Sequence, residues 1–443
     1  MRSAQSVQRL LACIEMPLLY ELALHNRGVA DTLRHHIMER LSEFPHVAER
    51  PTVIGDGSIF LEIHAESKDR EDWRQAAQVV LKRLSEPYAV FQSPSEGRST
   101  DVILSVFCGL FPLEPNIAGG DTRHARMAAS KARQMSASSE GVVVIYDEAL
   151  RTTNEKTLAH KQIVLTALGQ GTLQVFYQPK ICLTSGEIKG FEALIRPPKE
   201  PMEPWASYAG HIGALEIITA VNALNLMAEL TLHVLDTTNK DLQVWDALYP
   251  ECKPTVSINV PPNTLIQGWP LISKALERVF DPSRIIIEIT EHDLEVGGDS
   301  ERLNESINKL RDKGFGVAID DFGIGHSNLT RLTGLPFTEL KLDRALTQSL
   351  THNPMSHTLV RQLVSVTKHQ NLQIIAEGVE TSQERDIVKA LGINMAQGFL
   401  FGKPESAPQV TKQLGIQFDK RSDNIKSVAG KASGPTVKRI GDR

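Results

Sequence analysis

The sequence predicts an α/β protein built on a TIM-like (β/α)8 barrel, which a smaller α/β domain precedes. The first observation is alternation: from about residue 155 to 415, short apolar runs typical of strands alternate with amphipathic stretches typical of helices. Such alternation is the pattern of repeated βα units. The second observation is size, because eight strands within about 260 residues match the ~250 residues of a typical barrel.

The expected strands follow one another along this region. In chain order they are LQVFYQPKICL (173–183), KGFEALIR (189–196), PTVSINV (254–260), RIIIEIT (284–290), GVAIDD (316–321), ELKLD (339–343), LQIIAEG (372–378) and MAQGFLF (395–401). Amphipathic patterns predict helices at 301–313, 356–369 and 382–391 between them.

The rest of the chain has a different pattern. Within residues 1–150, strand-like and helix-like stretches follow one another at 52–66, 72–88, 101–112 and 125–150. They predict the smaller α/β domain. From residue 418 to 443 the apolar period is lost and Lys, Arg, Ser and Gly dominate, so this segment is predicted to be a flexible basic tail.

Composition narrows the classes of function. The 443 residues are 41% hydrophobic and 23% charged, which is ordinary for a globular protein of two or three domains. The net charge of −5 argues against binding to long nucleic acid. A small anionic ligand stays open, since a local site can be cationic.

No apolar stretch reaches eighteen residues, and the N-terminal LLACIEMPLLYELAL contains acids and lacks a small-residue cleavage site. We therefore expect neither a membrane span nor a signal peptide, and a cytoplasmic protein. The isolated cysteines, Cys13, Cys108, Cys182 and Cys252, fit buried thiols in a reducing compartment better than disulfides or zinc.

Seven polar residues each come from a different expected strand, and most lie toward its C-terminal end. They are Glu192, Asn259, Glu288, Asp320, Lys341, Glu377 and Gln397. In a barrel these strand ends meet at one mouth. Several carboxylates at one point need compensating cations, because a buried, unpaired carboxylate is costly.

The ligand types indicate which cations. Carboxylate oxygens with one Asn amide suit Mg²⁺ or Mn²⁺, and no cluster of His or Cys supports zinc. The adjacent carboxylates of Asp320 and Asp321 are compatible if metal ions lie between and beside them. Two metals ~3.5 to 4 Å apart are a common arrangement for phosphodiester hydrolysis.

Taken singly, these residues have plainer explanations. Glu192 or Glu288 would then be a solvated rim residue, Asn259 a turn cap, and Lys341 an edge-strand lysine that prevents aggregation. The DFG at 321–323 is not that of a protein kinase, since the other kinase motifs are missing. The plain explanations do not account for seven polar residues at equivalent places in successive βα units.

The same segments carry a family resemblance. FEALIR (191–196), SINV (257–260), EITE (288–291), AIDDFGIGHSNL (318–329), LKLD (340–343), AEGVE (376–380) and QGF (397–399) resemble, in order, the motifs of EAL-domain cyclic-di-GMP phosphodiesterases. The resemblance implies a barrel whose first strand is antiparallel, hydrolysis of cyclic di-GMP to linear pGpG, and a homodimer.

The resemblance also implies roles for individual residues. The implied metal ligands are Glu192, Asn259, Glu288 and Asp320 for one ion, with Asp321 and Glu377 helping to hold the second. Lys341 would orient or deprotonate the attacking water, so Lys341, Glu192 and Glu377 are the implied catalytic residues. The implied substrate groove is Gln178, Leu194, Arg196 and Gln397, and the implied supporting residues are Glu291 and Glu380.

Three positions depart from the family pattern. After Arg196 the family's Trp and its following acid-containing segment are replaced by PPKEPMEPWASYAGHIGALEIITAVN; the loop after Asp321 reads GIGHSN; and Lys180 stands where an aliphatic residue is usual. The altered segment keeps a second hypothesis open, a non-catalytic cyclic-di-GMP receptor or protein-interaction module. Retention of the metal-ligand acids favours the enzyme.

The first 150 residues resemble the later two-thirds of a GGDEF diguanylate-cyclase domain. GDGSI (55–59) stands at the signature turn without the catalytic acid pattern, and the metal-binding first strand looks absent or shortened. The GGD at 119–121 lies in a later loop and is taken as coincidental. The resemblance implies a degenerate, truncated regulatory domain without cyclase activity, which could bind a regulatory protein partner.

Overall fold

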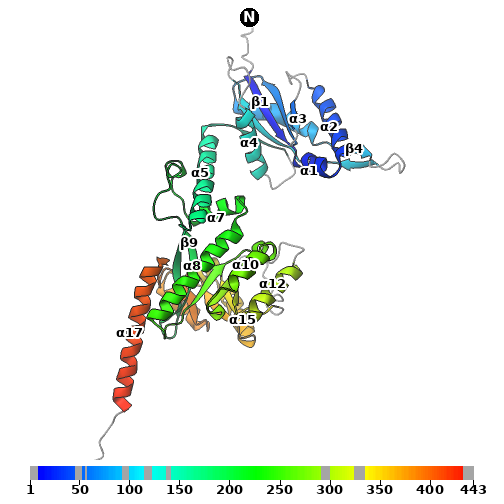
Figure 1. The fold of residues 1–443 in the computed structure, drawn as a ribbon. Coiled ribbons are helices and arrows are strands. Elements are labelled where there is room, and N and C mark those ends of the chain that lie inside the picture. The colour runs from blue at the N-terminus through cyan, green and yellow to red at the C-terminus, as the bar shows by residue number, and fades with distance from the viewer. Residues whose placement is uncertain are drawn as a thin grey trace, which may run out of the picture. The chain divides into compact units, whose positions relative to one another are not determined.

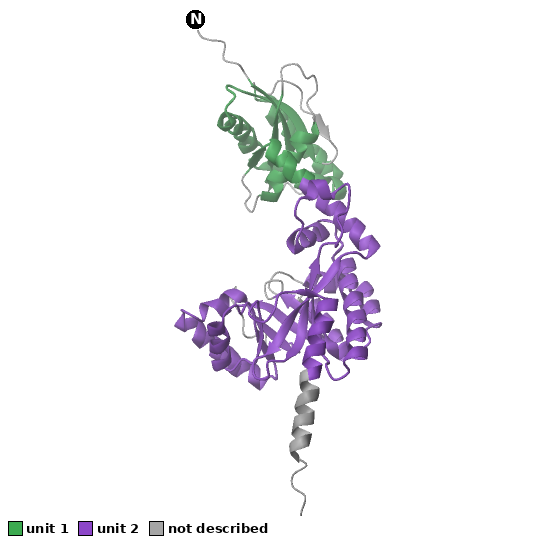
Figure 2. Cartoon of the chain, turned by 90° about the vertical axis from the view of Figure 1, so that its left-hand side faces the viewer, with its two compact units in different colours: residues 1–155 green, residues 156–443 purple. Residues whose placement is uncertain are grey.

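The computed structural model describes residues 8–44, 52–54, 57–91, 99–113, 122–135, 141–290, 300–323 and 335–432. The chain divides into two compact units, residues 1–155 (unit 1) and 156–443 (unit 2), as Figures 1 and 2 show. Each unit has its own hydrophobic core.

Unit 1 is a five-stranded sheet with helices on both faces. The strand order is β2-β3-β1-β6-β7, and only β6 and β7 pair in parallel. The strands are β1 (Gln8–Glu15), β2 (Thr52–Ile54), β3 (Ser58–Ala65), β6 (Phe107–Pro112) and β7 (Val142–Ile145), and a separate hairpin joins β4 (Tyr88–Phe91) to β5 (Ser99–Val102).

The helices of unit 1 divide between the two faces of this sheet. Helices α1 (Pro17–His25), α2 (Arg27–Ser42) and α3 (Arg70–Leu84) share one core with the sheet, while α4 (Thr122–Met135) packs on the other face. The approach of α4 is close because Gly109 of β6 has no side chain: a Cβ there would overlap the carbonyl oxygen of Ala125.

The expectation of an absent or shortened first strand is wrong. β1 has eight residues and lies at the centre of the sheet, between β3 and β6. Its segment QRLLACIE lacks strict alternation because both of its faces are covered, so it does not read as a half-buried strand. GDGSI (55–59) falls at the β2–β3 turn; its first two residues, like the GGD at 119–121, lie outside the described residues.

The strand-like stretch at 101–112 forms parts of two strands instead of one. β5 ends at Val102 and β6 begins at Phe107, with Leu104 and Val106 buried between them. Those buried side chains make the sequence look like one continuous apolar run.

Unit 2 contains the predicted TIM-like barrel. Strands β8 to β15 are hydrogen-bonded in chain order, and β15 pairs with β8 to close an eight-stranded barrel. β8 runs antiparallel to both of its neighbours, which confirms the antiparallel first strand. The strands are β8 (Gln174–Cys182), β9 (Ile188–Arg196), β10 (Thr255–Asn259), β11 (Ile285–Thr290), β12 (Gly316–Phe322), β13 (Glu339–Leu342), β14 (Gln373–Ala376), β15 (Met395–Gln397) and the short β16 (Glu405–Ser406), which pairs with β8.

All eight expected strands form, and the last is shorter than expected. The chain leaves β15 at Gly398, whose carbonyl oxygen accepts hydrogen bonds from the N–H groups of Phe401 and Gly402. The apolar residues after Gly398 therefore belong to a turn rather than to the strand.

The described helices of unit 2 include those expected at 301–313, 356–369 and 382–391. They are α5 (Glu148–Gln170, which contains the unit boundary), α6 (Ala206–Ala209), α7 (Ala214–Ala223), α8 (Met227–Leu248), α9 (Pro262–Gln267), α10 (Trp269–Leu276), the 3₁₀ turn η1 (Pro282–Arg284), α12 (Ser300–Asp312), α14 (Arg344–Ser349), α15 (Pro354–His369), α16 (Ser382–Ala390) and α17 (Ala407–Ala432). Figure 1 shows α8, α10, α12 and α15 around the barrel.

The alternation of strand residues separates an apolar exterior from a polar interior. On β11, Ile285, Ile287 and Ile289 join the core between strands and helices, whereas Glu288 faces the other way. The same alternation places Lys341 of β13 opposite to its neighbours Leu340 and Leu342. The barrel therefore holds a buried polar interior, which positions the site.

The predicted tail begins as part of a helix. α17 runs to Ala432, and Phe418 packs on the core with its ring 5.8 Å from that of Tyr249. Residues 433–443 lie outside the described residues. Within the part of the chain that is described, no helix has the length and apolar character needed to span a bilayer, and none of the four cysteines forms a disulfide there.

Candidate metal centre in the barrel

The structure brings the predicted polar residues of successive strands together at the carboxyl ends of the parallel strands. Gln178 comes from β8, Glu192 from β9, Asn259 from β10, Glu288 from β11, Asp320 and Asp321 from β12, Lys341 from β13, Glu377 from the residue after β14, and Gln397 from β15. Most of them are buried although they are polar. Only the closed barrel gives strands so distant in sequence a common interior.

The carboxylates form two groups that share one residue. Oxygens of Glu192, Glu288 and Asp320 lie within 4.8 Å of one another, and so do oxygens of Asp320, Asp321 and Glu377. Asp320 belongs to both groups. The two groups therefore form one continuous acidic cluster that could hold a metal.

The ammonium group of Lys341 lies among these carboxylates. Its Nζ is 2.7 Å from Glu377 Oε1, 2.8 Å from Glu288 Oε2 and 2.9 Å from Asp320 Oδ2. Glu192 Oε2 is farther, at 3.6 Å. Lys341 is fully buried, so these acids compensate its charge and raise its pKa well above the ordinary value despite the desolvation that opposes it.

One ammonium group does not compensate all the acids. Burial raises the pKa of Asp320 to about 7 and that of Glu377 to about 8, since the nearby carboxylates add to the desolvation and outweigh Lys341. Burial likewise raises the pKa of Asp321. The pKa of Glu288 falls to about 2: its burial would raise it, but Lys180 and Lys341 outweigh that effect. The centre thus retains an excess of acid that a metal could balance.

A β-bulge explains how Asp320 and Asp321 coexist. The pairing of β12 with β13 shifts register between Ile319 and Phe322, and Asp321 has a positive φ of 57°. Asp320 is buried whereas Asp321 is exposed, and the Asp321 N–H donates to Asp320 Oδ1 at 2.8 Å. A bulge commonly redirects a side chain beside a functional site, and here it separates two neighbouring carboxylates.

Side-chain amides hold Glu192 in place. Asn259 Nδ2 donates to Glu192 Oε1 at 2.8 Å, and Gln397 Nε2 donates to Glu192 Oε2 at 2.6 Å and to Gln178 Oε1 at 3.1 Å. Gln397 Oε1 is buried and has no hydrogen-bond partner among the described residues. A buried amide oxygen without a donor beside an acid cluster is an open acceptor for a ligand.

The remaining predicted residues lie at different distances from the acids. Leu194 and Arg196 continue β9 beyond Glu192 and are half-buried; the Arg196 guanidinium carbon lies 5.7 Å from the centre of the Phe176 ring. Glu380 pairs with Arg344 at 2.9 Å and is not among the clustered acids. Glu291 and the loop at 324–334 lie outside the described residues.

The altered segment after Arg196 has an acid with a local role. Glu216 lies in the first turn of α7, where its Oε2 accepts a hydrogen bond from the Gly213 N–H at 2.9 Å. Glu216 therefore caps its own helix.

Sequence reasoning assigned no role to Lys180, Ser257 and Glu339, which lie next to the acids. Lys180 Nζ is 2.9 Å from Glu288 Oε1 and 3.3 Å from Glu339 Oε2, and it also donates to Ser257 Oγ. Each stands two residues from a predicted site residue: Gln178, Asn259 and Lys341, respectively. The two-residue period of a strand is the signal that would have placed them on the same face.

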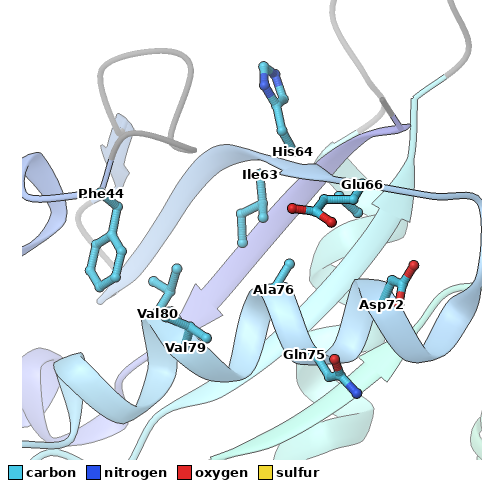
Figure 3. Close-up of a pocket in the computed structure, with 10 residues that line it drawn as sticks. Phe44, Ile63, His64, Glu66, Asp72, Gln75, Ala76, Val79 and Val80 are labelled. Carbon is cyan, nitrogen blue, oxygen red and sulfur yellow. The ribbon is translucent and has the colours of Figure 1, made fainter. Parts of the chain in front are cut away.

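A pocket in unit 1 has another chemistry. It has a volume of about 380 Å³ and lies between β3 and α3, with Ile63, Ala76 and Val80 near Glu66 and Asp72 (Figure 3). Neither acid belongs to a group of three potential metal ligands in the described parts of the chain. The barrel is therefore the stronger candidate for metal chemistry.

Comparison with known proteins agrees with the site. A family model described as "EAL domain" matches residues 161–404. The chain is 28% identical over 396 residues to the bifunctional diguanylate cyclase/cyclic di-GMP phosphodiesterase MucR of Pseudomonas aeruginosa. This match covers 87% of this chain and 55% of MucR. The chain is 33% identical over 246 residues to the cyclic di-GMP phosphodiesterase PdeR of Escherichia coli, covering 54% of this chain and 35% of that protein. The chain thus spans about half the length of the first relative and about a third of the second.

Solved structures show the same fold. An EAL enzyme in a cAMP-bound form is 25% identical with a TM-score of 0.51, and the match covers 60% of this chain and 72% of that chain. The FimX EAL domain of Xanthomonas citri, solved in complex with c-diGMP, has a TM-score of 0.50 at 17% identity, covering 58% of this chain and 97% of that chain. The second likeness concerns the fold alone.

Proposed function

The chain belongs to the EAL domain family, and we propose that its barrel is a metal-dependent phosphodiesterase that hydrolyses cyclic di-GMP to linear pGpG. The two curated relatives described above are named cyclic di-GMP phosphodiesterases. The observation that carries the proposal is the pair of carboxylate groups that share Asp320, with Lys341 between them. Such a pair supports two-metal phosphodiester chemistry.

The residues present fit two divalent cations, for which we propose Mg²⁺ or Mn²⁺. All candidate ligands offer oxygen, which these ions prefer. Among the described residues, six carboxylates (Glu192, Glu288, Asp320, Asp321, Glu339 and Glu377) gather in the barrel with the two ammonium groups of Lys180 and Lys341, a formal excess of four negative charges when all are ionised. Two divalent cations would neutralise that excess.

The geometry supports the ligand roles that we propose. Glu192, Asn259, Glu288 and Asp320 would hold one ion, and Asp320, Asp321 and Glu377 the other. Asn259 donates its amide nitrogen to Glu192, so its carbonyl oxygen is left for the cation. The bound ions would supply Lewis acidity toward the phosphate and lower the pKa of a coordinated water.

The chain's own residues would position the reactants. Lys341 lies at hydrogen-bond distance from three of the acids, where its ammonium group can hold the attacking water and stabilise the charge that develops on the phosphate. Arg196, at the end of β9, can donate two parallel hydrogen bonds to a phosphate. Gln178, Leu194 and Gln397 would line the groove beside it.

The test is hydrolysis of cyclic di-GMP by the purified chain with Mg²⁺ or Mn²⁺, with and without EDTA, following pGpG by chromatography. We expect metal-dependent product that Glu192→Gln lowers at least ~100-fold, because the variant loses a ligand charge while keeping its shape. The matched control is Glu187→Gln, an acid on the β8–β9 turn at the far end of β9, which should keep activity. Tight binding of cyclic di-GMP without product would contradict the enzyme and favour a receptor.

For unit 1 we propose a degenerate GGDEF-like regulatory domain without cyclase activity. Support comes from its βααββαβαβ element order, the β4–β5 hairpin left aside, and from MucR, whose match covers 87% of this chain and whose name includes diguanylate cyclase. GDGSI lacks the catalytic acid pattern at the turn before β3. Incubation with GTP and Mg²⁺ should therefore yield no cyclic di-GMP. The assay uses the Glu192→Gln variant, in which the phosphodiesterase would not remove that product, and accumulation of cyclic di-GMP would overturn the assignment.

We also propose a homodimer, on the ground of family membership. Light scattering at micromolar concentration should give twice the 48.9 kDa mass of the chain. A mass equal to a single chain would contradict it.

A further inference from the structure

Lys180 is a second buried lysine inside the barrel, on the strand that runs antiparallel to the rest. It is 1% exposed and lies two residues along β8 from Gln178, so both side chains face the interior. The residue of β9 that pairs with Lys180 is Gly190, which carries no side chain. Lys180 therefore reaches the acids from strand β8, whereas Lys341 reaches them from β13.

The two lysines divide the carboxylate of Glu288 between them. Lys180 Nζ is 2.9 Å from Glu288 Oε1, and Lys341 Nζ is 2.8 Å from Glu288 Oε2. Lys341 also contacts Asp320 and Glu377, whereas Lys180 contacts neither. Glu288 Oε1 thus faces away from Asp320 and Glu377, and Glu288 Oε2 faces toward them.

Lys180 is itself held in place. Glu339 Oε2 lies 3.3 Å from its Nζ, and Ser257 Oγ accepts a further hydrogen bond from it. Glu288, Glu339 and Ser257 come from three different strands, so the ammonium group is fixed from three directions. A lysine with three acceptors in a closed barrel has little freedom to move with the ligands.

We propose that Lys180 is a positioning residue for the metal centre: by holding Glu288 Oε1, it fixes this carboxylate so that only Oε2 is presented to a cation. The inference rests on the proposed function, because it assigns Glu288 as a metal ligand. Residues that orient a ligating group in this way typically change metal affinity or activity 10- to 100-fold when they are removed.

A purely electrostatic role predicts the opposite sign. If Lys180 only contributed positive charge, then removing it would strengthen cation binding, and removing Glu339 would weaken it. Removing both would restore the original charge and the original affinity. Orientation and charge are therefore separable in a cycle of two substitutions.

The experiment measures Mn²⁺ binding directly, by calorimetry and by the electron paramagnetic resonance of free Mn²⁺, in the full chain without substrate. The variants are Lys180→Met, Glu339→Gln and the double variant. We expect roughly 10- to 100-fold weaker Mn²⁺ binding in both variants that lack Lys180, including the charge-matched double variant. Tighter binding by Lys180→Met, or wild-type affinity in the double variant, would overturn the proposal.

Stability and activity assays separate this inference from its premise. Lys180→Met leaves Glu339 without its cation, so it can fold poorly; the double variant leaves no such lone charge and keeps the test available. Hydrolysis by the wild-type chain tests the proposed function alone. If the wild type hydrolyses cyclic di-GMP and the double variant binds Mn²⁺ as the wild type does, only the role of Lys180 fails. If the wild type binds no Mn²⁺, the metal assignment and the role of Lys180 both fail.

Discussion

At the scale of single residues, the buried carboxyl groups of the metal centre differ in pKa. Glu288 contacts both lysines and its pKa is lowered, whereas Asp320 and Glu377 share Lys341 and their pKa values are raised. The different partners explain this difference, since all three carboxylates are desolvated. Without a metal, the folded chain therefore holds protons at near-neutral pH that its unfolded form would release.

We expect the metal-free protein to lose stability as the pH rises from about 5 to about 8. The folded pKa values of Asp320 and Glu377, about 7 and about 8, lie above the ordinary values of 3.8 and 4.5. The stabilising contribution is complete below the unfolded pKa and is lost as the pH passes the folded one, by up to ~1.4 kcal/mol per pH unit for each proton released. Urea unfolding in the presence of EDTA, repeated between about pH 5 and about pH 8, measures this change in the free energy of unfolding.

The control for this pH dependence is Asp320→Asn combined with Glu377→Gln, which keeps the shapes and removes both titrations. The loss of stability between about pH 5 and about pH 8 should become shallower in this variant. Asp386→Asn, at an exposed position of α16, should leave it unchanged. An equally steep slope in the neutral double variant would assign the pH dependence to other groups.

At the scale of elements, the turn after β15 decides where Gln397 points. The Val379 N–H donates to the Gln397 carbonyl oxygen at 3.1 Å, so the segment after β14 and the end of β15 are hydrogen-bonded. Gly398 follows with a positive φ of 158° and lies against the backbone of Val379. Gly398 thus lets the end of β15 approach the segment after β14 closely, while the Gln397 side chain reaches Glu192.

Gly398→Ala should destabilise the chain by roughly 1–3 kcal/mol, because the added Cβ would overlap the backbone nitrogen and carbonyl oxygen of Val379. The matched control is Gly169→Ala on α5, where a Cβ would meet nothing within 4 Å and alanine is the better helix former. Denaturant unfolding should show opposite signs for the two variants. Equal stability of Gly398→Ala and the wild type would contradict the close approach.

At the scale of the whole molecule, two units carry two separate cores. One core joins the sheet of unit 1 to α1, α2 and α3, and the other lies between the barrel strands and their helices. All the clustered acids of the candidate metal centre belong to unit 2. A metal should therefore stabilise one unit directly.

Calorimetry should show two unfolding transitions, only one of which responds to Mn²⁺. At about 100 times the dissociation constant, a ligand that binds only the folded state adds ~2.7 kcal/mol, or roughly 5–10 °C for a domain of this size. EDTA should abolish the shift. A single transition that moves as a whole would mean that the two units unfold cooperatively.

The identity of the barrel strands and of most candidate ligands was predictable from local pattern. FEALIR, EIT and AIDD each place a carboxylate among the apolar residues of a strand, and eight strand-like segments at βα spacing predict a barrel. β1 was missed because a strand covered on both faces does not alternate. The extent of α17 was missed because a polar segment has no apolar period to mark a helix.

The sequence by itself determined which side chains share the barrel interior, because the two-residue period of a strand is a local property. Only the tertiary structure decided which of them touch: that Lys341 lies among Glu288, Asp320 and Glu377, that a bulge parts Asp320 from Asp321, and that Lys180 takes the other oxygen of Glu288. The physical reason is that closure of β15 onto β8 sets the register between strands far apart in the chain, and no local pattern encodes that register.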